Sequence, residues 1–229
     1  MAYPGGDTGH RVAELEELGV TGVSFGGPVS LGGLDVLGKG YVGVVVLARM
    51  DRQTIALKIR RTDSQRDNME GEAALLSVAN KAGVGPRLVA YSRNFLAMEY
   101  LEGERIGDWV CSLGEDDADA AGACARKILE DCYRLDEAGL DHGELSFISK
   151  HVIVGCKTTI VDFESSSTDR RPANVTSAAQ AIFMGGRIAR MIGRVLGQPP
   201  REELIGALRG YKQERNRGGF ESLLEVLRV

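Results

Sequence analysis

The sequence is poor in aromatic residues, and none of its four cysteines forms a C-x-x-C pair with another. Zinc sites need clustered ligands, and secreted disulfide frameworks usually belong to smaller chains that are denser in cysteine. Both classes are therefore disfavoured, and we expect free, buried thiols. The thiols concerned are Cys111, Cys124, Cys132 and Cys156.

An excess of positive charge and a long uninterrupted apolar run are also absent. The net charge of −4 gives no electrostatic footprint for non-specific nucleic-acid binding. Residues 1–10 are polar and glycine-rich and contain no apolar core of a signal peptide. The most apolar stretch, residues 178–196, carries three arginines that would be costly at the centre of a bilayer. We therefore expect a soluble, cytoplasmic protein without a membrane partner.

The chain is long enough for one large domain or two small lobes, with 229 residues of which 43% are hydrophobic. Residues 1–33 are expected to form a short amphipathic helix at 11–18 and then a glycine-rich connector. Residues 34–101 are rich in β-branched residues, with a hairpin turn at 51–53 and one internal helix.

Residues 102–229 change to a mostly helical pattern. A β-hairpin is expected at 152–162, and the helices that follow it are expected at 174–196, 201–211 and 220–229. The order of the two halves predicts an α+β fold, with an antiparallel sheet in the first half and a helical second half.

A glycine-rich segment lies between two of the predicted strands. We match residues 37–44 to the pattern G-x-G-x-x-G-x-V, with glycines at 38, 40 and 43. A dinucleotide site would need a helix after the glycines, and here a strand follows. Glycines between two strands let the backbone close over phosphates. The alternative is a plain glycine-rich hairpin.

Lys58 favours the phosphate interpretation, because it lies in the otherwise apolar run 55–59 on the next strand. A lysine there is either on an exposed face or a buried cation that needs an anionic partner. Glu72 on the following helix is our preferred partner, and Glu70 is its rival. Lys58 would then bridge Glu72 and the phosphates of a nucleotide.

These motifs resemble those of the protein-kinase superfamily, in which V-A-I-K corresponds to residues 55–58. Residues 98–101 are similar to the segment that links the two kinase lobes. The resemblance implies that the backbone of Glu99 and Tyr100 binds adenine, that Met98 lies behind the pocket, and that Val44 and Ala56 sandwich the base. The nucleotide-binding residues it implies are Gly38, Lys39, Gly40, Gly43, Val44, Ala56, Lys58, Glu72, Met98, Glu99 and Leu101.

The second half continues the resemblance. Residues 142–145 (His-Gly-Glu-Leu) are similar to H-R-D-L, or to the H-G-D-L of Rio-type and other small atypical kinases. Residues 161–164 (Val-Asp-Phe-Glu) resemble D-F-G, which implies that Asp162 binds Mg²⁺ on the phosphates of ATP. Small predicted archaeal Ser/Thr kinases share the G-E-L and D-F-E variants.

The sequence also departs from the kinase pattern. Glu144 stands where an aspartate accepts the substrate proton, and a displacement of about an ångström can cost about 100-fold in rate. The asparagine that holds the second Mg²⁺ is replaced by Ser149 or His151, depending on the alignment, although histidine is a poor Mg²⁺ ligand. Glu164 either helps to hold metal or is a surface carboxylate. No A-P-E motif follows, so regulation by activation-loop phosphorylation is not expected.

Three arginines, Arg187, Arg190 and Arg194, share one face of a predicted helix. Together with Arg170 and Arg171 they are candidates for docking RNA or an acidic partner, and a solvated face is the commoner alternative.

The sequence therefore predicts a two-lobed, protein-kinase-like domain that binds ATP and Mg²⁺ and phosphorylates a protein on serine or threonine. Catalysis is expected to rest on Lys58, Glu144 and Asp162, with His142 shaping the loop. One alternative is an ATPase or scaffold of the same fold that acts in assembly of a protein or RNA–protein complex. A small-molecule phosphotransferase and an inactive binding module are the others.

Overall fold

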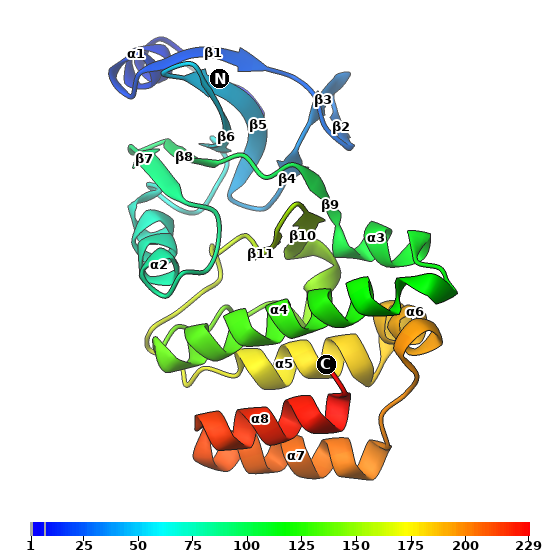
Figure 1. Ribbon diagram of the computed structural model, residues 1–229. Helices are drawn as coiled ribbons and strands as arrows, with labels where there is room; N and C mark the ends of the chain where they lie inside the picture. The colour runs from blue at the N-terminus through cyan, green and yellow to red at the C-terminus, as the bar shows by residue number, and fades with distance from the viewer. Residues whose placement is uncertain (1, 7) are drawn as a thin grey trace. The chain divides into compact units, whose positions relative to one another are not determined.

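The structure is a computed structural model that describes residues 2–6 and 8–229 (Figure 1). The chain forms two compact units. The N-terminal unit runs to Asn80 and resumes over Pro86–Leu101, whereas the C-terminal unit comprises Lys81–Gly85 and Glu102–Val229. The mixed α+β class with antiparallel sheets, predicted from the sequence, is confirmed.

The N-terminal unit is built on an antiparallel sheet with the strand order β1-β5-β6-β8-β7, and β4 pairs with β5. The separate β2–β3 hairpin and two helices complete it. The bounds are α1 Gly9–Glu17, β1 Val20–Ser24, β2 Val29–Leu31, β3 Leu34–Val36, β4 Gly38–Lys39, β5 Gly43–Met50, β6 Gln53–Arg60, α2 Glu70–Lys81, β7 Leu88–Tyr91 and β8 Phe95–Glu99.

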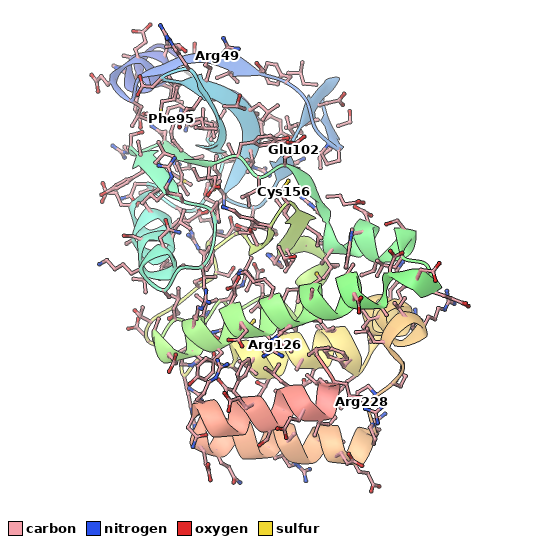
Figure 2. The ribbon with its side chains drawn as sticks, viewed as in Figure 1. Arg49, Phe95, Glu102, Arg126, Cys156 and Arg228 are labelled. Carbon is pink, nitrogen blue, oxygen red and sulfur yellow. The ribbon has the colours of Figure 1, made fainter. Side chains whose placement is uncertain are left out.

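Strands β5 and β6 form the centre of this sheet and place alternate side chains on its two faces. They pair without a break from Gly43 opposite Arg60 to Met50 opposite Gln53. One face is the buried core, to which Phe95 of β8 also belongs (Figure 2). The core residues of β5 and β6 are Val44, Val46, Ala48, Ile55, Leu57 and Ile59.

In the segment up to residue 33 the expected helix is present as α1, but the expected connector contains two strands, β1 and β2. β1 is an edge strand that pairs with β5 from Val20 to Ser24. β2 pairs with β3 through a two-residue turn at Gly32 and Gly33, whose φ angles are 58° and 84°. Two consecutive left-handed residues are what a tight hairpin turn requires, so these glycines connect strands that the connector interpretation missed.

The C-terminal unit contains a three-stranded sheet in the order β11-β10-β9 and a set of packed helices. Within this unit, Figure 1 shows α4, α5 and the pair α7–α8 stacked in successive layers. The bounds are β9 Gly103–Arg105, α3 Ile106–Ser112, η1 Glu115–Asp117, α4 Ala118–Glu137, η2 Leu145–Lys150, β10 Val152–Gly155, β11 Thr158–Ile160, α5 Asn174–Phe183, α6 Gly186–Leu196, α7 Arg201–Glu214 and α8 Arg217–Leu227.

Two expectations about this unit are corrected. The helix predicted at 174–196 is broken into α5 and α6, because Gly186 has a φ of 82°, which an α-helix cannot continue through. Cys124 and Cys132 are buried as expected, but Cys111 and Cys156 are exposed. Among the described residues, none of the helices has both the length and the apolar character that crossing a membrane requires.

Candidate functional site

Lys58 lies on the face of the N-terminal sheet opposite the core, and apolar side chains surround it. Its neighbours across the strands are Val45 on β5 and Leu96 on β8. Two positions away, Ala56 lies between Leu47 and Met98 in the same way. The ammonium group is therefore set in a largely apolar surface, and only 4% of Lys58 is exposed. We call this surface the lysine face.

The carboxylate predicted to pair with Lys58 is present, and it belongs to Glu72 of α2. The Lys58 Nζ atom donates to Glu72 Oε1 at 2.7 Å, and both residues are 4% exposed. Glu70, the rival candidate, is exposed to solvent. A buried ion pair is costly to desolvate, so its presence on an otherwise apolar face indicates a use beyond stability.

The structure corrects the position of the valine in the glycine-rich motif. Val44 pairs with Ile59 and is part of the core, so it points away from Lys58 and Ala56. Val45 is on the lysine face instead, because strand side chains alternate. Counting two residues from Gly43 in G-x-G-x-x-G-x-V also gives Val45. The sequence analysis missed Val45, Leu47 and Leu96, which the two-residue period identifies.

The glycine-rich loop is a turn between β4 and β5, with Gly38 and Lys39 in β4. The Gly40 N–H donates to the Gly43 carbonyl at 2.8 Å and closes the turn. Gly43 leaves no room for a side chain, since an added Cβ would lie 2.8 Å from the Ile59 carbonyl oxygen and 3.0 Å from Lys58 Cγ. Gly43 thus lets β5 pass directly over the base of the Lys58 side chain.

Replacing Gly43 by alanine is expected to destabilise the N-terminal unit by about 1–3 kcal/mol, because overpacking forces backbone to shift. Faster hydrogen exchange over residues 43–60 would report this loss. Gly22→Ala in β1 is the matched control, since nothing lies within 4 Å of a Cβ added there. Equal exchange in the two variants would contradict the crowding inferred at Gly43.

In the segment expected to bind adenine, the backbone N–H of Glu99 is already engaged within the sheet. The Glu99 N–H donates to the Arg87 carbonyl at 2.8 Å, and the Glu99 carboxylate accepts from the Arg87 N–H at 3.1 Å. Glu99 can therefore offer a nucleotide its carbonyl but not its N–H. Leu101, the last residue of the N-terminal unit, is partly exposed just beyond β8.

In the C-terminal unit, backbone hydrogen bonds hold the loop 141–151 against the segment 161–167. Asp141 and Ser167 exchange a pair of bonds at 2.8 and 2.9 Å. The Val161 N–H donates to the His151 carbonyl at 2.9 Å. The two predicted motifs, His-Gly-Glu-Leu and Val-Asp-Phe-Glu, are thereby brought side by side.

Three side chains from these segments converge. The ligand atoms of Glu144, His151 and Asp162 all lie within 4.8 Å of one another. His151 Nε2 and Glu144 Oε2 are 3.7 Å apart, and the His151 side chain is 8% exposed. Asp162 has a φ of 71°, a left-handed conformation that is uncommon outside glycine and that concentrates at functional sites.

His142 is a buried support for this group. Its Nε2 lies 3.1 Å from the Val161 carbonyl, and its ring packs edge-on against Phe163 with centroids 5.2 Å apart. Burial lowers the pKa of His142 to about 4, so the ring is neutral at physiological pH. His142 therefore fixes the carbonyl that precedes Asp162 and is not suited to proton transfer.

Asn174 and Asp136 hold the start of the loop 141–151 by hydrogen bonds. Asn174 Oδ1 accepts from the His142 N–H at 2.8 Å, and Asn174 Nδ2 donates to the Leu140 carbonyl at 2.7 Å. Asp136 accepts from the Asn174 N–H at 2.9 Å and from the Tyr211 hydroxyl at 2.8 Å. Burial raises the pKa of Asp136, and the hydrogen bonds from these donors offset only part of that rise.

Arg170 supports this loop, a role that the sequence analysis did not identify, since it named Arg170 only as a docking candidate. Its Nε donates to Asp141 at 2.9 Å and its Nη2 to the Ser165 carbonyl at 2.6 Å. A Cβ on Gly143 would lie 2.6 Å from Arg170 Nη2, and Gly143 has a φ of 87°. The guanidinium thus occupies the space of a side chain at 143, which no sequence motif indicates.

The comparison with known proteins gives a family but no activity. No model of a known protein family matches the chain. A protein of Methanocaldococcus jannaschii, named "Uncharacterized protein MJ1211", is 32% identical over 95 residues, which cover 42% of this chain and 79% of that relative. The chain belongs to the family of MJ1211. The name of this relative states no activity.

The remaining predicted site residues of this MJ1211-family chain differ in their position relative to Glu144, His151 and Asp162. Ser149 packs against α3, since a Cβ on Gly107 would lie 3.1 Å from Ser149 Cβ. Of the two candidates for the second metal ligand, His151 is the one that the structure groups with Glu144 and Asp162. Glu164 is partly exposed two residues beyond Asp162. The candidate docking arginines are exposed on α6, and they are Arg187, Arg190 and Arg194.

Proposed function

We propose that the chain is a two-lobed, kinase-like enzyme that transfers the γ-phosphoryl group of ATP to a serine or threonine hydroxyl of a protein. The observation that carries the proposal is the buried pair of Lys58 and Glu72, 2.7 Å apart, beside a glycine that admits no side chain. A lysine kept charged on an apolar face is suited to bind phosphates, and a fixed carboxylate orients it.

The N-terminal unit supplies the proposed nucleotide-binding residues. The turn that follows Gly38 and Lys39 and contains Gly40 would cover the phosphates, with Lys58 bound to their oxygens. The apolar side chains of the lysine face would contact the base, and the Glu99 carbonyl would accept from its amino group. The residues proposed for the base contact are Val45, Leu47, Ala56 and Met98.

The C-terminal unit supplies the proposed chemistry. Glu144 would accept the proton of the acceptor hydroxyl as its oxygen attacks the γ-phosphorus. The bond from the γ-phosphorus to the β–γ bridging oxygen breaks, and ADP leaves with the bonding electrons. The neutral His142 ring and the Asn174 amide hold the loop, so Glu144 keeps its position during the transfer.

Asp162 is the residue proposed to hold Mg²⁺. Its carboxylate fits a hard cation, whereas the imidazole of His151 does not favour Mg²⁺. Bound Mg²⁺ neutralises charge on the phosphate oxygens in such reactions. The backbone at Asp162 is left-handed, and this conformation sets the direction of its side chain. Strain of this kind persists only where the surrounding structure enforces it.

An ATPase of the same fold is the second candidate function. Two observations favour it: glutamate replaces aspartate at 144, and an imidazole joins the group where a second-metal asparagine would be expected. In that case water accepts the phosphoryl group, and the nucleotide state regulates binding of a partner. The exposed arginines of α6 are the proposed docking surface for an acidic or RNA-containing partner.

The test incubates the protein with γ-labelled ATP and Mg²⁺. The label is then measured in protein and in free phosphate in the same reaction. We expect label on protein in the wild type, and a decrease of about 100-fold or more in Glu144→Gln, within the range that general-base catalysis contributes. Glu104→Gln, an exposed carboxylate of β9, is the matched control. Free phosphate alone would favour the ATPase, and neither product would overturn both functions.

A further inference from the structure

We infer that Glu144, His151 and Asp162 form a metal site that selects a transition ion such as Mn²⁺ over Mg²⁺ and fills without nucleotide. Glu144 lies just before η2, His151 just after η2, and Asp162 two positions after β11. All belong to the C-terminal unit. A catalytic role for this metal site rests on the proposed function. Binding of the ion requires only the three ligands and can be tested separately.

The spacing of the ligand atoms matches a shared ion better than a direct contact. His151 Nε2 and Glu144 Oε2 are 3.7 Å apart, within the range of an ion pair but beyond the length of a hydrogen bond. Two ligands that bind one ion at about 2.0–2.2 Å lie roughly 3–4 Å from each other. The full set of three falls within 4.8 Å, which leaves room for one ion at its centre.

The state of His151 supports this assignment. The residue is 6% exposed, and in the part of the chain that the structure describes its Nδ1 has no hydrogen-bond partner. If the proton is on Nδ1, the Nε2 lone pair faces the Glu144 carboxylate, which is repulsive. If the proton is on Nε2, it lies too far from that carboxylate to bond well. A cation between the two groups removes the conflict at Nε2.

The ring is also held in place, as a metal ligand requires. The His151 N–H donates to the Ile148 carbonyl at 3.0 Å, and its own carbonyl accepts from Val161. Its ring packs edge-on against His142, with centroids 5.3 Å apart. Preformed ligands lose little entropy when the ion binds, so this site does not need phosphates to assemble it.

The donor set determines which ion is preferred. Mg²⁺ demands oxygen ligands in near-ideal octahedral geometry, whereas imidazole suits transition ions. One nitrogen with two carboxylates therefore favours Mn²⁺, Fe²⁺ or Co²⁺. A carboxylate can ligate through one oxygen and keep the other for a proton, so ligation by Glu144 Oε2 leaves Oε1 for the acceptor hydroxyl.

The experiment measures binding of Mn²⁺ to the metal-stripped, full-length protein without nucleotide, from the loss of the free-ion electron paramagnetic resonance signal. Mg²⁺ is then added as competitor. We expect one Mn²⁺ per chain, bound at least about tenfold more tightly than Mg²⁺, in keeping with the preference of nitrogen-containing sites. His151→Asn, which replaces the nitrogen donor by oxygen, is expected to weaken Mn²⁺ by about tenfold or more and leave Mg²⁺ within about threefold.

Two further variants make the result decisive. Glu144→Gln should weaken both ions, because it removes a charged ligand shared by either. His10→Asn is the matched control, since His10 is exposed in α1 of the other unit. Absence of stoichiometric Mn²⁺ binding, or equal Mn²⁺ affinity in wild type and His151→Asn, would overturn the inference. Mn²⁺ binding without phosphoryl transfer would support the metal site and contradict the proposed kinase activity. Phosphoryl transfer without a preference for Mn²⁺ would support the kinase activity and contradict the metal site.

Discussion

Asp162→Asn is expected to lower the rate of γ-phosphoryl transfer by roughly 1,000-fold, with the fold unchanged. A metal ligand at the phosphates stabilises transition-state charge by several kcal/mol, and each 1.36 kcal/mol is tenfold in rate. The backbone at Asp162 has a φ of 71°, and asparagine is among the few residues that tolerate this conformation. The substitution therefore removes charge without adding strain.

The measurement is the initial rate of label transfer, with thermal unfolding as the check on folding. Asp169→Asn is the matched control, because Asp169 is an exposed aspartate seven positions further on. Asp162→Val should both abolish transfer and lower the melting temperature, since a β-branched residue is a true outlier at positive φ. Transfer by Asp162→Asn at more than a tenth of the wild-type rate would remove Asp162 from the proposed mechanism.

Glu72→Leu is expected to destabilise the N-terminal unit by about 3–5 kcal/mol, the usual cost of removing one partner from a buried ion pair. The substitution takes away the carboxylate 2.7 Å from Lys58 Nζ on a face where little water can replace it. The double variant Lys58→Met/Glu72→Leu should recover most of this loss, because apolar side chains suit the lysine face. Loss of nucleotide binding is expected in both variants.

Hydrogen exchange of the β6 and α2 peptides is the appropriate measurement for this pair. The single tryptophan, Trp109, lies in α3 of the C-terminal unit, so its fluorescence reports on the other unit. Asp63→Asn is the control, since Asp63 forms an exposed ion pair with Arg61, and pairs of this kind contribute little to stability. A double variant as unstable as Glu72→Leu would contradict the view that the pair is kept for function.

The sequence predicted the parts of the fold that follow from periodicity. The β5–β6 hairpin, α2 and the β10–β11 hairpin lie where alternation or helical spacing indicated. The same periodicity applied one step further would have assigned Val45, not Val44, to the lysine face. Glu72 could be chosen over Glu70 because helical spacing relates it to the buried Leu76.

Other features depend on contacts between distant segments, which periodicity does not encode. β1 is a strand because it pairs with β5, although its own sequence is short and contains a glycine. His151 lies beside the segment of Asp162 because the Val161 N–H bonds to the His151 carbonyl, and no count along the chain distinguishes His151 from Ser149. Whether the group binds metal, and whether Lys58 binds phosphates, stay predictions.

The surroundings of Gly143 constrain which residues the loop 141–151 can accept at this position during evolution. A side chain at 143 would meet the Arg170 guanidinium at 2.6 Å and would also face a φ of 87°. The guanidinium is the flexible end of a side chain and can move, whereas the Ser165 carbonyl oxygen, 2.8 Å from a Cβ added at 143, is part of the backbone. Replacing Arg170 therefore does not by itself make position 143 permissive, and glycine is retained there unless the backbone of both segments changes as well.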